Sequence, residues 1–233
     1  MADNILEIKD LTKNFGSKYV LNQISFSLSK GKVLGILSPN GRGKTTLLNI
    51  ISGLMKPTSG NILICNESQS VNSKRLISYL QEKEYLPRTM SVDNAVNFYK
   101  GFFPDFQSDK ISVLLDDMKI LPSMKLKSLS KGTMEKLNLA LTLSRKSSLY
   151  ILDEPISGVD IISRDKILNT IINHIDEDSS MIITSHYVGE LENIFDEVIF
   201  LGDGTIIESG NAEDLRIKYG TSIEQIYRKI FAE

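Results

Sequence analysis

The sequence predicts an α/β fold in which helices flank a mainly parallel β-sheet. Residues 33–37, 149–152 and 181–184 are short, continuously apolar runs, as expected for strands buried on both faces of a parallel sheet. Residues 45–54 and 164–175 have helical patterns and lie between such runs. Alternation of buried strands with helices is typical of a sheet covered by helices on its faces.

Two segments depart from this alternation and predict additions to the sheet. The first 35 residues alternate apolar and polar side chains in the manner of exposed strands, which predicts an N-terminal antiparallel β subdomain. Residues from about 92 to 145 show helical spacing instead. We therefore expect one domain over residues 1–233 that contains a helical insertion subdomain at roughly 88–146.

Composition narrows the class of protein. The chain has 233 residues, of which 41% are hydrophobic and 24% charged, and its net charge is −2. These values suit a globular protein and exclude disorder as the main state. A near-neutral chain lacks the basic field of a general nucleic-acid binder, so we expect no nucleic-acid partner. No run approaches 18 apolar residues, so we expect a cytoplasmic protein that could be only peripheral to a membrane.

The turn after the strand at 33–37 has the pattern of a phosphate-binding P-loop. Its glycines let backbone N–H groups surround phosphate oxygens, and the following helix offers its positive N-terminus. The lysine can reach the β- and γ-phosphates, and the next hydroxyl can ligate Mg²⁺. The first position of the pattern is usually glycine and is serine here. The expected nucleotide-binding residues are Ser38, Asn40, Gly41, Arg42, Gly43, Lys44, Thr45 and Thr46.

Two carboxylates follow the apolar run at 149–152. Asp153 and Glu154 stand where a parallel strand would end, and α/β sheets bind ligands at the carboxyl ends of their strands. We expect Asp153 to hold Mg²⁺ and Glu154 to polarise the attacking water as general base. Alone this pair is a weak signal, and the P-loop earlier in the chain makes it a strong one.

Two more stretches suggest contacts to phosphate. Ser130 and Gly132 precede a predicted helix at 134–143, where a hydroxyl and backbone N–H groups can bind phosphate. Alone, this pattern is more often an ordinary helix cap. His186 follows the buried run at 181–184, and an imidazole there can hydrogen-bond a γ-phosphate and sense its loss.

In this order, these stretches resemble the ATP-binding subunit of an ATP-binding cassette (ABC) transporter, a P-loop NTPase, over nearly the whole chain. Residues 38–46 resemble the Walker A motif and 151–155 the Walker B motif with its catalytic glutamate. Residues 129–132 resemble the signature motif, and 157–160 resemble the D-loop. His186 matches the switch histidine of the family.

The resemblance also implies residues that the chemistry alone does not single out. Phe15 falls where the family stacks an aromatic ring on adenine. The Q-loop residue, a further Mg²⁺ contact, falls on Glu82, with Gln81 as the alternative. Residues 129–132 and 102–106 most resemble the bacterial ABC-2, export-type group, in which the permease is usually a separate chain.

The resemblance implies the mechanism as well. Lys44, Glu154 and His186 would be catalytic, with ATP and Mg²⁺ as cofactors and Thr45, Asp153 and Glu82 around the metal. Two ATPase subunits would pair head-to-tail, so that Ser130 and Gly132 act on the partner's ATP. The dimer, homomeric or heteromeric, would drive an integral membrane permease from the inner face of the cell membrane. Aromatic residues from 98 to 106 would line the groove for the permease, although at least half of them would instead pack inside the helical subdomain.

Other functions remain as alternatives. A soluble, non-transport ABC ATPase usually needs a second cassette or a long coiled coil. A small-molecule P-loop kinase leaves residues 129–132, 157–160 and His186 without a role. A nucleotide-sensing regulatory subunit conflicts with intact Lys44, Glu154 and His186, but Ser38 keeps it open. The sequence does not indicate the cargo.

Overall fold

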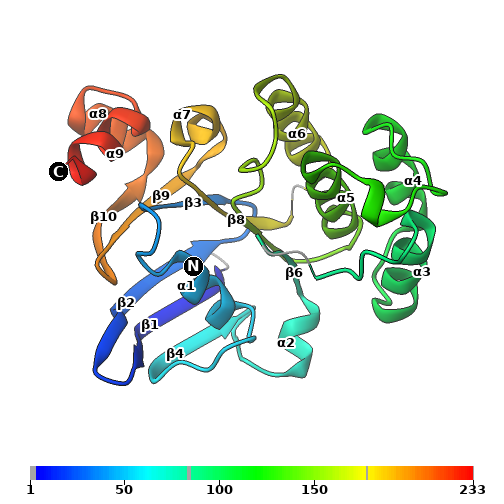
Figure 1. Cartoon of the computed structure of the whole chain (residues 1–233). Coiled ribbons are helices and arrows are strands. Elements are labelled where there is room, and N and C mark those ends of the chain that lie inside the picture. The colour runs from blue at the N-terminus through cyan, green and yellow to red at the C-terminus, as the bar shows by residue number, and fades with distance from the viewer. Residues whose placement is uncertain (1–3, 83–84, 177, 233) are drawn as a thin grey trace.

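The computed structural model describes residues 4–82, 85–176 and 178–232. Its strands form a six-stranded sheet of order β10-β9-β3-β8-β7-β6 and a four-stranded sheet of order β2-β1-β4-β5 (Figure 1). Neighbouring strands from β9 to β6 are parallel, whereas β10 and the whole smaller sheet are antiparallel. The strands are β1 Asn4–Phe15, β2 Lys18–Ser29, β3 Val33–Leu37, β4 Ser59–Ile64, β5 Glu67–Ser68, β6 Ile77–Leu80, β7 Leu149–Asp153, β8 Ser180–Ser185, β9 Glu197–Gly202 and β10 Thr205–Asn211. The predicted fold class is confirmed.

Helices fill the connections between strands. The α-helices are α1 Lys44–Ile51, α2 Val71–Arg75, α3 Val92–Phe102, α4 Ser108–Asp117, α5 Lys131–Leu143, α6 Ile161–Asn173, α7 Val188–Leu191, α8 Ala212–Tyr219 and α9 Ile223–Phe231, and the 3₁₀ helices are η1 Leu126–Ser128 and η2 Glu192–Ile194. Within the described ranges, no helix is long and apolar enough to cross a membrane.

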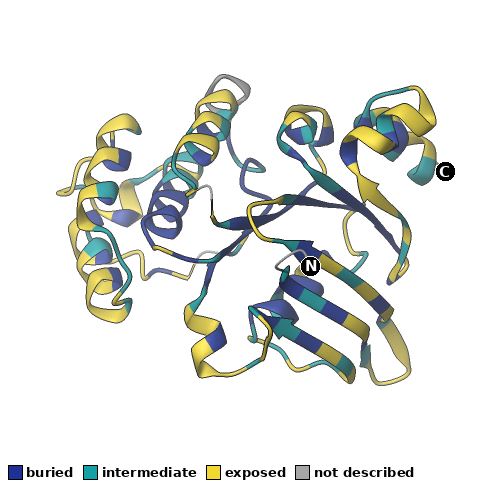
Figure 2. Ribbon diagram, turned by 180° about the vertical axis from the view of Figure 1, so that it is seen from behind, coloured by how far each residue is buried: buried dark blue, intermediate teal, exposed yellow. Residues whose placement is uncertain are grey.

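The large sheet separates two hydrophobic cores, because successive side chains of a strand point to opposite faces. On β7, Leu149 and Ile151 pack into the core shared with α1 and the smaller sheet. Tyr150 and Leu152 pack into the core shared with α5, α6, α7 and α9. Both faces of the central strands are therefore buried (Figure 2), which explains their continuous apolar sequences.

The predicted helical insertion corresponds to α3, α4 and α5, which lie together at one end of the large sheet (Figure 1). Arg145 ties this subdomain to the sheet. Its buried guanidinium donates to both carboxylate oxygens of Asp105 (3.2 and 3.0 Å) and to the carbonyl oxygens of Ile77 and Arg75 (2.5 and 2.8 Å). It also lies 4.1 Å from the centre of the Phe103 ring.

Sequence patterns missed several elements. The run Ile77–Leu80 forms the edge strand β6, and three short helices, α2, α7 and α8, were not predicted. The helix expected at 134–143 begins earlier, at Lys131, because Ser130 serves as its N-cap and accepts a hydrogen bond from the Thr133 amide at 3.2 Å. The assignment of residues 1–233 to one domain stays a prediction.

Candidate ATP-binding and hydrolysis site

The P-loop joins the end of β3 to α1, and its backbone explains which positions need glycine. Gly41 and Gly43 have φ of +79° and +103°, a region that other residues rarely adopt. A Cβ on Gly43 would also come within 3.0 Å of the Val20 carbonyl oxygen. Ser38 is not among the described residues with positive φ, so the backbone accepts serine where the motif usually has glycine.

Lys44 is buried at the centre of this loop. Its ammonium donates to the carbonyl oxygens of Ser38 (2.6 Å) and Pro39 (3.3 Å), and it lies 3.6 Å from Oε1 of Glu154. Ser38 thus contacts Lys44 through its backbone carbonyl oxygen. A glycine at this position would offer the same oxygen. The loop fixes its cation beside the carboxylate that follows β7.

Asp153 links three elements at the carboxyl edge of the sheet. The hydroxyl of Thr45, on α1, donates to its Oδ2 at 3.0 Å, and the hydroxyl of Thr184, on β8, donates to its Oδ1 at 2.6 Å. Burial raises the pKa of Asp153, and the two hydroxyl groups oppose that rise. Hydroxyl and carboxylate oxygens are ligands that Mg²⁺ prefers, so Thr45 and Asp153 fit the predicted metal site.

Glu154 and His186 form a pair beside Asp153. Nδ1 of His186 lies 2.9 Å from Oε2 of Glu154, and a carboxylate only accepts, so the ring nitrogen donates. The His186 amide also donates to Oε2, at 3.3 Å. Oε1 of Glu154 is buried without a hydrogen-bond partner among the described residues. The glutamate is held at one oxygen, and the other oxygen faces Lys44.

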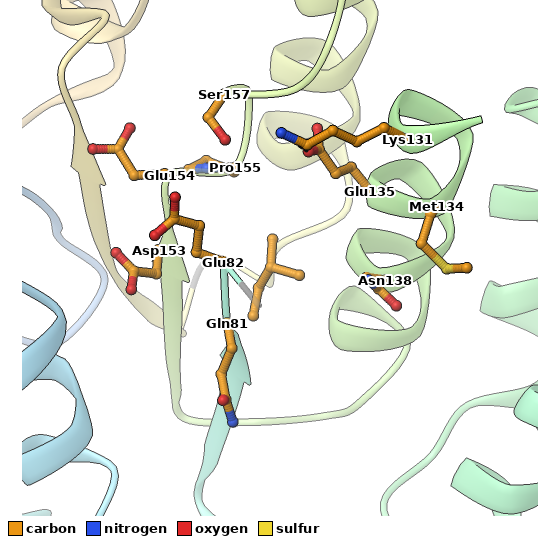
Figure 3. A pocket seen from close by; sticks show the side chains of 11 residues that line it. Gln81, Glu82, Lys131, Met134, Glu135, Asn138, Asp153, Glu154, Pro155 and Ser157 are labelled. Carbon is orange, nitrogen blue, oxygen red and sulfur yellow. Dashed lines mark ion pairs between the residues drawn. The ribbon is translucent and has the colours of Figure 1, made fainter. Parts of the chain in front are cut away.

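These groups share one cavity of about 440 Å³, which the P-loop lines together with Glu82, Asp153, Glu154 and His186. Glu82 contributes to the raised pKa of Asp153, since a second negative charge disfavours ionisation. In Figure 3 the side chains of Glu82 and Gln81 point in opposite directions, and that of Glu82 extends toward the end of β7. Glu82 therefore lines the P-loop cavity, whereas Gln81 does not, and the Q-loop role of Glu82 stays a prediction.

The predicted site residues that do not line this cavity are Ser38, Arg42, Phe15, Ser130 and Gly132. Ser130 and Gly132 stand at the start of α5, where the Ser130 hydroxyl is 2.8 Å from that of Thr133. Phe15 ends β1, is 52% exposed and has the Lys13 ammonium 5.1 Å from its ring centre. Arg42 of the P-loop forms an ion pair with Asp203 of the β9–β10 turn.

Thr184 is a site residue that the sequence interpretation missed. Its hydroxyl donates to Asp153, and its carbonyl and hydroxyl oxygens both lie 3.2 Å from the Glu154 amide. Through these contacts β8 positions both carboxylates of the site. A threonine two residues before His186, at the end of a buried strand, was the available signal.

Comparisons with known proteins identify the family of this chain. Residues 21–157 match the family described as ABC transporter. The chain is 31% identical to an uncharacterized ABC transporter ATP-binding protein of Methanocaldococcus jannaschii, over 90% of this chain and 79% of that protein. It is 29% identical to the lantibiotic transport ATP-binding protein SrtF of Streptococcus pyogenes, over 94% of this chain and 97% of SrtF.

A solved structure described as the ATP-binding subunit of an ABC transporter has the same fold. It superposes with a TM-score of 0.88 at 22% identity, and the match covers 97% of this chain and 99% of that one. The chain therefore belongs to the ABC transporter family as one of its ATP-binding subunits, which bind and hydrolyse ATP.

Proposed function

We propose that Glu154 is the general base of this ATPase and that His186 and Lys44 are its catalytic partners. The observation that carries the proposal is the position of one buried carboxylate between His186, at 2.9 Å, and Lys44, at 3.6 Å. A general base must be oriented and within reach of the proton that it takes. His186 orients Glu154, and Lys44 stands where the β- and γ-phosphates enter the P-loop.

Thr45, Asp153 and Glu82 would hold Mg²⁺, which neutralises charge on the phosphates when it is bound. The hydrogen bond between Thr45 and Asp153 supports this assignment, because it brings a hydroxyl and a carboxylate together at the phosphate end of the cavity. Ser38, Asn40, Gly41, Arg42, Gly43 and Thr46 complete the nucleotide-binding loop, and Phe15 stacks on the adenine.

The working unit is a head-to-tail dimer in which Ser130 and Gly132 complete the ATP site of the partner subunit. Two observations support this arrangement. The start of α5 presents a capped helix N-terminus, which is suited to binding phosphate. Neither residue lines the P-loop cavity of its own chain.

An apolar groove supports a permease partner for this subunit. A cavity of about 390 Å³ lies between β6 and α3 and is lined by Leu54, Tyr85, Phe98 and Phe102, among others. Leu54, Phe98 and Phe102 are exposed. Phe103 lines this cavity and also packs against the helical core. Phe106 packs against that core and does not line the cavity. A cytoplasmic helix of a separate integral membrane permease would occupy this groove.

The direction of transport is export, and the subunit acts as a peripheral protein on the inner face of the cell membrane. The similarity to SrtF, a lantibiotic transport ATP-binding protein, supports a place in the export-type group. The resemblance of residues 102–106 and 129–132 to the ABC-2 group supports the same assignment.

Two measurements test the proposal. His186→Ala and Lys44→Ala should each abolish ATP turnover by the purified chain, and wild-type turnover in either variant would remove that residue from its role.

Phe98→Ala combined with Phe102→Ala should abolish co-purification of the permease while basal ATPase activity remains. Leu121→Ala is the matched control, because Leu121 is also exposed but does not line the groove.

A further inference from the structure

Arg164 makes three different contacts close to the catalytic pair. It stands on α6, just after the D-loop, and its side chain is only 13% exposed. Its Nε donates to the carbonyl oxygen of Val159 at 3.0 Å, and its Nη1 donates to Oε1 of Glu190 at 2.6 Å. Its guanidinium carbon lies 4.0 Å from the centre of the Tyr187 ring. Two directional hydrogen bonds fix the plane of the cation that faces this ring.

The Tyr187 ring in turn contacts the switch histidine. The ring centres of Tyr187 and His186 are 4.0 Å apart, with an angle of 41° between the planes. His186 follows β8 in a loop, and its side chain is 35% exposed. Its ring is held by the hydrogen bond to Glu154 on one side and by Tyr187 on the other. Without the tyrosine ring, a single hydrogen bond would hold a partly exposed imidazole.

The other side of the D-loop is tied to the signature helix. The Gly158 amide donates to Oε2 of Glu135 on α5 at 3.0 Å. The D-loop is therefore attached to α5 through Gly158 and to Arg164 through Val159. Direct contacts then run from Arg164 through Tyr187 and His186 to Glu154.

The geometry points to Arg164 as a positioning residue for His186: it holds Tyr187 against the imidazole and links the histidine to the D-loop. A displacement of the D-loop moves the Val159 carbonyl group, to which Arg164 is hydrogen-bonded. The contact of Arg164 with the Tyr187 ring then changes. The position of the D-loop then sets the geometry of the His186–Glu154 pair. This inference rests on the catalytic roles proposed above for His186 and Glu154.

Arg164→Gln removes the positive charge and the N–H donors of the guanidinium. Tyr187→Leu keeps an apolar side chain but removes the aromatic ring. We expect each to lower kcat about tenfold, because small displacements of a catalytic group are costly. KM for ATP should stay within about twofold, since neither residue lines the P-loop cavity. Tyr187→Phe retains the ring and should keep wild-type kcat. The double variant of Arg164→Gln and Tyr187→Leu should be no slower than either single variant, because both remove the same support.

Nuclear magnetic resonance gives a readout that a purely structural role would not move. The chain has only two histidines, His174 and His186, so His174→Gln leaves one imidazole to observe. In that background, Arg164→Gln should shift the ring signals of His186 while it keeps the Tyr187 ring, whose loss would shift these signals by itself. The matched control is Arg216→Gln, because Arg216 also bridges a carboxylate and a carbonyl, those of Glu213 and Glu192. It should leave the His186 signals and kcat unchanged.

His186→Ala distinguishes failure of this inference from failure of the proposed site. If His186→Ala is inactive while Arg164→Gln and Tyr187→Leu keep wild-type kcat, the positioning role is wrong and the catalytic roles stand. If His186→Ala keeps wild-type kcat, the proposed role of the histidine itself is wrong. Should Arg164→Gln fail to fold, the contrast between Tyr187→Leu and Tyr187→Phe decides. Equal losses in those two variants would overturn the inference.

Discussion

The two regions predicted to contact ATP are organised in different ways. In the P-loop region, side chains from α1, β7, β8 and the following loop bond to one another, as in the contacts of Thr45 and Thr184 with Asp153 and of His186 with Glu154. In the signature region, the Ser130 side chain bonds to Thr133, one turn further along its own helix, and its carbonyl oxygen accepts from the Met134 amide. The first region is positioned by tertiary structure, whereas the second depends on a local helix cap.

This difference shows what each region can do without a partner. The P-loop region has the proposed catalytic groups in place, with Glu154 bonded to His186 and the Lys44 ammonium buried. The groups of the signature region that are proposed to bind phosphate line no part of the P-loop cavity in the described residues. If the proposed dimer is correct, the second subunit brings the N-terminus of its α5 to the P-loop site of the first. Both parts are already formed before the subunits associate.

The largest effect should come from Glu154→Gln, which tests the preformed region. The amide keeps the shape of the side chain but cannot accept the proton of the attacking water, so kcat should fall by about 100-fold or more. ATP binding should persist and trap an ATP-bound dimer, which size-exclusion chromatography with ATP and Mg²⁺ would detect. Turnover at the wild-type rate would remove Glu154 from its role.

Mixing two inactive variants tests the region that depends on a partner. Lys44→Ala removes the P-loop cation, and Gly132→Asp places a carboxylate against the partner's γ-phosphate. Each variant alone should be inactive. In a symmetric homodimer, random 1:1 mixing makes about half of the dimers mixed, each with one intact site, so roughly a quarter of the sites should be restored.

Partial recovery of ATPase activity on mixing would support composite sites. Absence of recovery, with mixed dimers shown to form, has two explanations. Either the signature acts in its own chain, or a dimer with only one intact site does not hydrolyse ATP. A tethered dimer with one wild-type half and one Lys44→Ala half separates them. Activity of that dimer, with none in the mixture, would show that the signature does not act in trans.

Phe15→Ala should have a smaller effect. Loss of stacking on adenine should weaken ATP affinity by about 1–3 kcal/mol, on the scale of base–aromatic stacking. Phe15 is exposed and its ring contacts Lys13, so the substitution should leave the folded state intact. Isothermal titration calorimetry would measure the ATP affinity, in the Glu154→Gln background so that ATP is not hydrolysed during the titration. Unchanged affinity would assign the aromatic contact to another residue, and the neighbouring Tyr19, also exposed, is the first to test.

Sequence predicted the parts of the fold that a short pattern encodes. The buried strands were recognisable because both of their faces are apolar, and the P-loop because its glycines adopt positive φ. The edge strand β6 was missed because its four residues, Ile-Ser-Tyr-Leu, are too few for a periodic signal. Thr184 and Arg164 were missed because their importance lies in contacts with residues 31 and 23 positions away, at Asp153 and Tyr187.

The smallest effect concerns Asp153 in the nucleotide-free protein. Burial raises its pKa in the folded state, so ionisation of this carboxyl costs stability. By linkage, that cost is present at pH values above the folded pKa and absent below the unfolded pKa of about 3.9. Asp153→Asn removes the charge, and its amide can accept from one of the two hydroxyl groups, of Thr45 and Thr184, and donate to the other. We therefore expect a higher Tm at about pH 8, by about 2–4 °C for each ~1 kcal/mol gained.

Two comparisons sharpen this last prediction. Thermal unfolding at about pH 4 should show a smaller difference between Asp153→Asn and wild type, because a raised pKa means that more of the wild-type carboxyl is protonated in the folded protein as the pH falls. Asp178→Asn is the matched control, because Asp178 is exposed and its ion pair with Lys30 lies at the surface, where such pairs contribute little. With ATP and Mg²⁺ present, Asp153→Asn should have a lower Tm than wild type, since the proposed metal ligand is lost. A lower Tm of nucleotide-free Asp153→Asn at about pH 8 would mean that the hydroxyl–carboxylate hydrogen bonds outweigh the cost of burying the charge.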